Sequence, residues 1–202
     1  MAGWHEEVWA AVPPDALPER FEQRRELLLS DVIAGQRVLD LGCADGRFSA
    51  ALVGAGASVV GVDAAAEALR RARERATEAE FVQSEEGAPL PLADDSFDLV
   101  WCGETLEHVV DVALLLGEVR RVLRPGAMLL ATTPNHARLR VAYEALAGRP
   151  LERRLDPRSD HLRFFTAHTL RELLSGAGFE QVSVIAVDGP PLLRRSLIAR
   201  AR

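Results

Sequence analysis

The chain has 202 residues and a formal net charge of −6, and 48% of its residues are hydrophobic. This length suits one well-filled domain with a short N-terminal extension, and no apolar run approaches the roughly eighteen residues that a membrane span needs. The acidic balance argues against general affinity for nucleic acid, because contacts to phosphates need a basic face.

The N-terminal part, residues 1–35, is predicted to be a helical extension or lid. Its start has no basic region followed by an apolar core, so we expect no secretory signal and a cytoplasmic protein. Apolar residues recur at helical spacing from Glu19 to Ala34, and Gly35 is a natural helix end. Trp4 and Trp9 either cover the active site or anchor this helix on the sheet edge.

An apolar run at Arg37–Leu41 predicts a buried parallel strand that leads into a ligand-binding turn. Asp40 is the acid near the end of that strand. Gly42 and Gly46 bracket the turn, because glycine adopts positive φ and lets a ligand approach the bare backbone. A dinucleotide-binding fingerprint would need the spacing Gly-x-Gly-x-x-Gly, which this turn does not have.

A second acid closes the next predicted strand, Ser58–Asp63. About twenty residues beyond a glycine turn, such an acid accepts hydrogen bonds from ribose hydroxyls in doubly wound folds, so we expect Asp63 to hold a ribose. Asp63 could also cap the helix that follows, Ala64–Thr77. The two cysteines, Cys43 and Cys102, rule out a disulfide framework and fit a reducing compartment, and we expect reduced thiols packed beside a ligand.

The rest of the chain alternates between predicted strands and helices and closes with a hairpin. This order describes an α/β fold with an open, mainly parallel, doubly wound sheet and helices on both faces. The remaining expected elements are a strand at Ala79–Ser84, a strand at Phe97–Cys102, a helix at Val112–Leu123 stopped by Pro125 and Gly126, a strand at Ala127–Thr133, a helix from Thr166 to Ser175, a strand at Gln181–Val187 and an antiparallel strand at Ser196–Ala201.

Three side chains that suit metal or proton chemistry follow the Phe97–Cys102 strand. If residues 104–108 form one helical turn, Glu104, Glu107 and His108 share a face and offer a three-point chelate. His161 is a fourth candidate ligand. Without a metal, His108 or His161 would be the general base, or His108 would pack beneath the ligand while the two glutamates hold the loop.

The segment from Asp40 to Gly46 resembles motif I of the class I S-adenosylmethionine-dependent methyltransferases, with Ala44 in place of the middle glycine. Four further landmarks of this family follow in order: Phe97–Cys102, Glu107–His108, Arg121–Gly126 and Thr133–Asn135. The resemblance implies a seven-stranded Rossmann-like sheet of order 3-2-1-4-5-7-6 over residues 36–202, with residues 136–165 as a cap or insertion. It also implies S-adenosyl-L-methionine as the cofactor.

In the related methyltransferases an acid about five residues before a Leu-Pro proline bonds the adenine amino group. Counting back from Pro91 gives Glu86, with Glu85 as a substitute. The residues expected at the cofactor are Asp40, Gly42, Cys43, Ala44, Gly46, Asp63, Ala64, Glu86 and Cys102.

The Glu-x-x-Glu-His turn with a later histidine resembles the ubiquinone-biosynthesis O-methyltransferases and the small-RNA 3′-terminal 2′-O-methyltransferases. Both groups hold a divalent cation with these residues, which implies Mg, Mn or Zn at Glu104, Glu107, His108 and His161. The ion would lower the pKa of the acceptor hydroxyl and orient its oxygen.

We therefore expect a methyltransferase that acts on an oxygen of a small molecule. The alternatives are an RNA 3′-terminal 2′-O-methyltransferase and a regulatory protein that binds the cofactor without catalysis. The segment from Arg138 to Arg163 contains seven arginines and four acidic residues. Its excess of positive charge is either solvated surface or a site for an anionic ligand or partner. The acceptor and the oligomeric state remain open.

Overall fold

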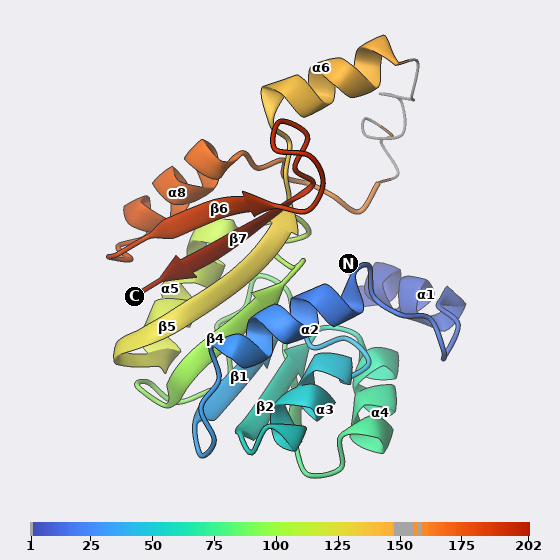
Figure 1. The fold of residues 1–202 in the computed structure, drawn as a ribbon. Helices are drawn as coiled ribbons and strands as arrows, with labels where there is room; N and C mark the ends of the chain where they lie inside the picture. Colours follow the sequence, from blue (N-terminus) through green and yellow to red (C-terminus); the bar gives the residue numbers. More distant parts are fainter. Residues whose placement is uncertain (1, 148–155, 157–158) are drawn as a thin grey trace. The chain divides into compact units, whose positions relative to one another are not determined.

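The computed structural model describes residues 2–147, 156 and 159–202, and the side chains from residue 6 onward (Figure 1). The side chain of Trp4, for which a role as cover or anchor was predicted, lies outside this description, as do residues 148–155 and 157–158 of the predicted cap. Seven strands form one sheet in the order β3-β2-β1-β4-β5-β7-β6, as the resemblance to the methyltransferases implied. By its contacts the chain divides into two compact units: unit 1 is 1–101 with 118–128, and unit 2 is 102–117 with 129–202.

Unit 1 holds the parallel strands that follow the N-terminal helices. β1 pairs with β2 in register, with Val38 opposite Val59 and Leu39 opposite Val60, and β2 pairs with β3. Helix α3 packs on β1 and β2, α4 packs on β2 and β3, and α1 packs on α4. Its elements are α1 (Ala2–Ala11), α2 (Phe21–Ser30), β1 (Arg37–Leu41), α3 (Arg47–Gly54), β2 (Ser58–Asp63), α4 (Ala66–Arg75) and β3 (Glu80–Gln83).

The core of unit 1 is tight where β2 passes under the turn after β1. A Cβ atom at Gly61 would lie 2.6 Å from the Phe81 ring and 3.0 Å from Cys43 Sγ, so only glycine fits between these side chains. Cys43 is 2% exposed, and Cys102, at the end of β4 in unit 2, is 0% exposed. Both are reduced thiols, as the sequence predicted.

Three elements run from one unit into the other: β4 (Phe97–Gly103), α5 (Val112–Val122) and β5 (Leu123–Pro134). Within unit 2, β7 pairs antiparallel with both β5 and β6, and α8 packs on β6 and β7. Thr166 begins α8 with a reciprocal capping box in which its side chain accepts from the Thr169 N–H. The remaining elements are α6 (Arg138–Leu146), α8 (Ala167–Gly176), β6 (Ser183–Val187) and β7 (Ser196–Ala201).

Several element boundaries differ from the prediction. β5 begins at Leu123, directly after α5, whereas Pro125 and Gly126 predicted a break and a start at Ala127. Residues 104–108 do not form the helical turn on which the shared face of Glu104, Glu107 and His108 depended. Glu104 has φ +56°, and the His108 N–H donates to the Thr105 carbonyl in a turn. Helix α6 was not predicted. Among the described residues, none of the helices is both long and apolar enough to cross a membrane.

Candidate active site

The glycine turn after β1 is tied to the end of β2. The backbone N–H groups of Gly42 and Cys43 both donate to the Val62 carbonyl, at 2.8 and 3.0 Å. The Ala44 N–H donates to Asp63 Oδ2 at 2.9 Å. The chain turns sharply here because Gly42, Ala44 and Gly46 all have positive φ, at 74°, 53° and 78°. Ala44 therefore adopts the left-handed conformation that glycine would adopt more easily.

Asp63 lies at the junction of this turn and helix α4. Its second oxygen, Oδ1, accepts the N–H of Ala65 at 3.0 Å. The alternative that Asp63 is the N-cap of α4 is wrong, because α4 starts at Ala66 and its N-cap residue is Ala65. The Ala65 side chain makes no capping hydrogen bond. Each carboxylate oxygen has a second lone pair, so Asp63 can still accept a ligand hydroxyl.

Asp40 is buried below the turn. Asp40 is only 1% exposed, and its Oδ2 accepts a hydrogen bond of 2.6 Å from the Ser49 hydroxyl. Burial raises the pKa of Asp40 from 3.8 to about 7, and Asp63 adds to this rise, while the Ser49 bond and Arg24 oppose it. A cationic group near Asp40 would therefore favour its ionised form.

Arg24 on α2 is a residue that the sequence reasoning missed. Its guanidinium carbon lies 4.8 Å from the Phe48 ring centroid and 5.7 Å from that of Trp101. Stacking on these two rings directs a fixed positive charge toward the region of Asp40. An arginine about sixteen residues before the strand acid is a sequence signal, but Arg24 is one of four arginines in this stretch and the pattern does not single it out.

The remaining expected cofactor residues are placed as follows. Glu86, in the loop after β3, is half-buried, whereas Glu85 beside it is exposed, and Ala64 is half-buried after Asp63. Gly46 packs directly on α4, because a Cβ atom there would lie 2.8 Å from Ala72 Cα. The described structure thus brings Ala44 and Asp63 into direct contact.

A second group of expected site residues gathers in unit 2. Ligand atoms of Glu107, His108 and His161 all lie within 4.8 Å of one another. The two imidazole rings meet edge to face, with centroids 4.8 Å apart and planes at 77°. Glu104, which was expected as a further ligand, is not part of this group, and its backbone has a positive φ of 56°. The Glu104 N–H instead donates to the Thr132 carbonyl at 2.8 Å.

The hydrogen bonds of His108 fix its neutral tautomer. Its Nδ1 lies 3.0 Å from the backbone carbonyl oxygen of Asp160. A carbonyl only accepts hydrogen bonds, so Nδ1 carries the proton and Nε2 keeps its lone pair. Burial lowers the pKa of His108, although the Asp160 carboxylate opposes this. Near neutral pH the ring therefore presents an unprotonated nitrogen.

The segment that carries His161 is strapped to the segment that carries Glu107 and His108. The Glu107 carbonyl accepts the N–H groups of Leu162 and Arg163, at 2.8 and 3.1 Å. Arg163 also donates through Nε to the Val109 carbonyl at 2.9 Å and through Nη2 to the next carbonyl. The Glu107 side chain, 1% exposed, accepts from Thr133 Oγ1 at 3.0 Å.

Buried polar atoms lie at the ends of β4 and β5, and of the residues that carry them the sequence analysis had assigned Glu104 but neither Thr132 nor Asn135. Glu104 Oε1, Thr132 Oγ1 and Asn135 Oδ1 are buried and accept or donate no hydrogen bond within the described residues. Asn135 Nδ2 donates to the Arg194 carbonyl, which fixes the orientation of the amide. Buried polar atoms without a partner are uncommon and often mark ligand positions. Their signal in sequence was the polar run that ends the β5 strand.

Comparison with known proteins identifies the family. A methyltransferase-domain model matches residues 7–184. The ubiquinone biosynthesis O-methyltransferase of Thiobacillus denitrificans is 31% identical over 80% of this chain and 72% of its own length, and that of Psychrobacter arcticus is 29% identical over 83% and 68%. The solved structure of an S-adenosylmethionine-dependent methyltransferase from Mesorhizobium loti matches with 26% identity and a TM-score of 0.70, over 94% of this chain and 100% of that one. With this sheet order and these relatives, the chain belongs to the class I S-adenosylmethionine-dependent methyltransferases.

Proposed function

We propose that this methyltransferase methylates a hydroxyl oxygen of a small molecule. The observation that carries the proposal is His108: a half-buried, neutral imidazole with Nδ1 bonded to a carbonyl and Nε2 left to take a proton. A base that titrates near or below neutrality suits the removal of a hydroxyl proton. The relatives named above are O-methyltransferases by name, which supports an oxygen acceptor.

The cofactor would be held by residues of unit 1. Asp63 would accept the ribose hydroxyls, and the N–H groups and positive φ angles of the turn at Gly42–Gly46 suit a close backbone approach. Asp40 and Arg24 would face the charged methionine end, where an ammonium favours the ionised carboxyl and a carboxylate favours the guanidinium. Glu86, more buried than Glu85, would meet the adenine. Cys43 and Ala64 would line the cofactor by packing.

The cofactor supplies a methyl group that its positively charged sulfur already activates. The protein then has to align the acceptor oxygen, exclude water and take one proton, and it needs no covalent intermediate. His108 Nε2 would take that proton, and His161, whose ring lies edge to face with it, would bind or orient the acceptor.

A divalent cation fits the same residues. Glu107, His108 and His161 give one carboxylate and two imidazoles, and Glu104, whose Oε1 is buried without a hydrogen-bond partner, is proposed as the fourth ligand. The two imidazoles suit Zn, whereas the carboxylates suit Mn or Mg. When bound, the ion would lower the pKa of the acceptor hydroxyl. The strap from Arg163 to Val109 would then hold the ligands in place.

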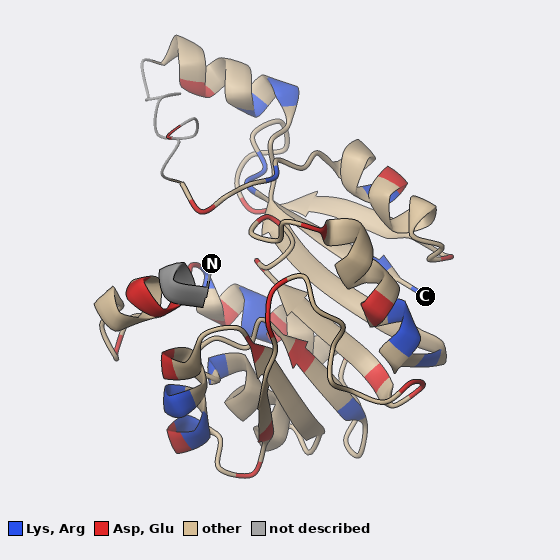
Figure 2. Cartoon of the chain, turned by 180° about the vertical axis from the view of Figure 1, so that it is seen from behind, with Lys and Arg blue, Asp and Glu red and all other residues tan. Residues whose placement is uncertain are grey.

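Residues 136–165 are proposed to cap the acceptor. Within this segment, α6 exposes Leu139, Tyr143 and Leu146, at 57%, 51% and 89%, spaced so that they share one helix face. Such an apolar face suits an apolar acceptor. The arginines at the start of α6 are visible in Figure 2, and Arg140 pairs with Glu144 at 2.9 Å.

The test measures methyl transfer from labelled cofactor to a panel of phenols and catechols and, in parallel, to short RNA with a 3′-terminal hydroxyl. We expect transfer to a hydroxylated small molecule that is lost in His108→Ala. His168→Ala is the matched control, because His168 is exposed on α8 and its ion pair within the described residues is with Glu172, at 3.3 Å. Transfer to RNA alone, or full activity in His108→Ala, would refute the proposal.

The cation is tested separately by elemental analysis of the purified protein and by titration with Zn and Mn. Loss of binding in His161→Ala together with retained binding in His168→Ala would support the site. A wild-type protein that binds neither ion, yet transfers methyl groups, would leave His108 as the base and remove the cation from the proposal.

A further inference from the structure

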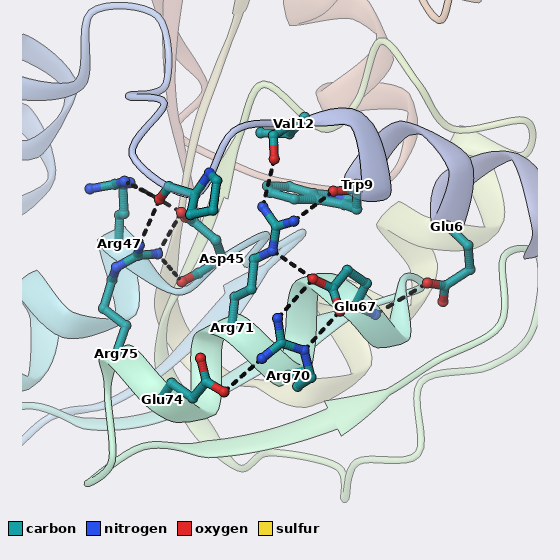
Figure 3. A network of polar contacts seen from close by, with 11 residues as sticks. Glu6, Trp9, Val12, Asp45, Arg47, Glu67, Arg70, Arg71, Glu74 and Arg75 are labelled. Atoms are coloured by element: carbon teal, nitrogen blue, oxygen red, sulfur yellow. Dashed lines mark hydrogen bonds and ion pairs between the residues drawn. The ribbon is translucent and has the colours of Figure 1, made fainter.

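Helix α4 holds the N-terminal segment, defined here as residues 6–14, along one side (Figure 3). The Glu6 carboxylate accepts the N–H groups of Ala66 and Glu67, the first two of the helix, the second at 3.2 Å. One turn further on, Arg71 donates to the carbonyls of Trp9 and Val12 at 3.0 and 2.8 Å. These bonds replace a side-chain cap that α4 lacks in its own sequence.

The other end of α4 holds the glycine turn. Arg75 donates to the Asp45 carbonyl and pairs with its carboxylate, both at 2.5 Å. Arg47, from the start of α3, pairs with the same carboxylate at 3.1 Å. Both guanidinium groups also reach the Pro14 carbonyl, at 3.4 Å from Arg75 and 3.1 Å from Arg47. The same two side chains therefore hold the last residue of the N-terminal segment and the acid of the turn (Figure 3).

Asp45 is buried inside the turn, between Ala44 and Gly46. The Ala44 N–H is bonded to Asp63, and Gly46 lies against the backbone of Ala72 without room for a Cβ atom. A shift of Asp45 must therefore displace the backbone that the cofactor would contact, because packed backbone has no free volume to absorb the movement.

We infer that docking of the N-terminal segment on α4 is coupled to cofactor binding at the glycine turn, and that Arg75 and Arg47 are the positioning residues that carry this coupling through Asp45. The inference rests on the proposed place of the cofactor at Gly42–Gly46. Coupling between two sites is reciprocal, so the cofactor must hold the segment as much as the segment favours the cofactor.

The neighbouring arginine on α4 gives a matched control. Arg70 pairs with Glu67 at 2.8 Å and with Glu74 at 2.6 Å, both within α4, and in the described part of the chain it has no polar contact with the N-terminal segment or the turn. Arg71 shares Glu67 with it at 2.8 Å but also holds Trp9 and Val12. Substitution of either arginine by glutamine removes one positive charge from the same helix, and only Arg71→Gln releases the segment.

The experiment uses the full chain and S-adenosylhomocysteine, the product of the cofactor. Amide hydrogen exchange of residues 6–14 is measured with and without this nucleoside, and its affinity is measured by calorimetry. We expect the nucleoside to slow exchange of the segment. We expect Arg71→Gln to weaken binding by about 5-fold or more, the lower end of ordinary coupling, and Arg70→Gln to leave it unchanged.

Arg75→Gln is expected to speed exchange in the segment and to weaken binding together, and Arg75→Lys, which keeps the charge and one donor, to restore part of both. Should Arg71→Gln fail to fold, Glu6→Gln releases the same segment with less change to α4. Faster exchange with unchanged affinity in Arg71→Gln would overturn the inference, as would a bound nucleoside that leaves exchange of the segment unaltered. A wild-type protein that does not bind the nucleoside at all would overturn the cofactor assignment and this inference together.

Discussion

Asp40 should lower the unfolding free energy of the wild-type protein between pH 5 and pH 8. Replacing Asp40 by asparagine should remove this loss of stability. Asp40 is buried, and its pKa in the folded protein is raised from 3.8 to about 7. A raised pKa means that the folded state prefers the proton, so the stability from this group is complete below pH 3.8 and is lost as the pH rises through 7. Asparagine keeps the acceptor for the Ser49 hydroxyl but carries no charge.

The size of the effect follows from the pKa difference. A difference of about three units corresponds to about 4 kcal/mol between acid and alkaline pH, of which about 3 kcal/mol falls between pH 5 and pH 8. Urea unfolding of both proteins at these two pH values gives the change in unfolding free energy, and the difference between wild type and Asp40→Asn isolates the one carboxyl from all other titrating groups.

A carboxyl of opposite behaviour serves as the control. The Arg37 N–H and Arg124 lower the pKa of Asp98, so its stabilising effect is present above the unfolded pKa and is lost as the pH falls through the lower folded value. Asp98→Asn should therefore cost stability at pH 8 and little in strong acid. Equal pH dependence in wild type and Asp40→Asn would refute the reasoning, because it would mean that Asp40 titrates normally in the folded protein.

Three further outcomes are expected. Gly46→Ala should destabilise the protein more than Gly35→Ala in thermal unfolding: both have positive φ, which costs an alanine about 1–2 kcal/mol, but only Gly46 lies against the backbone of α4. Asp63→Ala should weaken binding of S-adenosylhomocysteine by about 10-fold to 100-fold in calorimetry, since hydrogen bonds to a charged group contribute about 1.5–3 kcal/mol, and unchanged affinity would place the ribose elsewhere. Thr133→Val should reduce Zn or Mn affinity by about 10-fold to 100-fold by removing the donor to Glu107, while Thr133→Ser should retain it; equal affinities in all three proteins would exclude Thr133 from the support of the metal site.

Elements with a clear hydrophobic pattern and a polar end were predictable. The β2 and β7 bounds, Ser58–Asp63 and Ser196–Ala201, agree with the sequence prediction, because each is a short apolar run with polar residues at its limits. Thr166 marked the start of α8 for the same local reason, since a threonine cap acts within one turn. Helix α6 escaped prediction because none of its residues is buried, so it has no apolar face in a core.

The site could be predicted as a set of residues, not as a geometry. The glycine turn and Asp63 follow from local sequence, and His161 joins Glu107 and His108 as the resemblance implied. Glu104 has a positive φ, and its N–H donates to the carbonyl of Thr132, twenty-eight residues away, a contact that spacing along the chain cannot reveal. The strap from Arg163 to Val109 likewise joins residues far apart in the sequence, where no local rule applies.

The labelling rates of the two buried cysteines can report local opening of the two units. Cys43 lies in unit 1 and Cys102 in unit 2, so each unit holds one thiol. Burial also raises the pKa of the Cys43 thiol, which slows its reaction with labelling reagents further. Labelling of either thiol then requires local opening of the unit that contains it. Mass spectrometry of the labelled chain would measure the rate of opening of each unit separately, without any engineered probe. It would also report whether a bound ligand slows opening in one unit or in both.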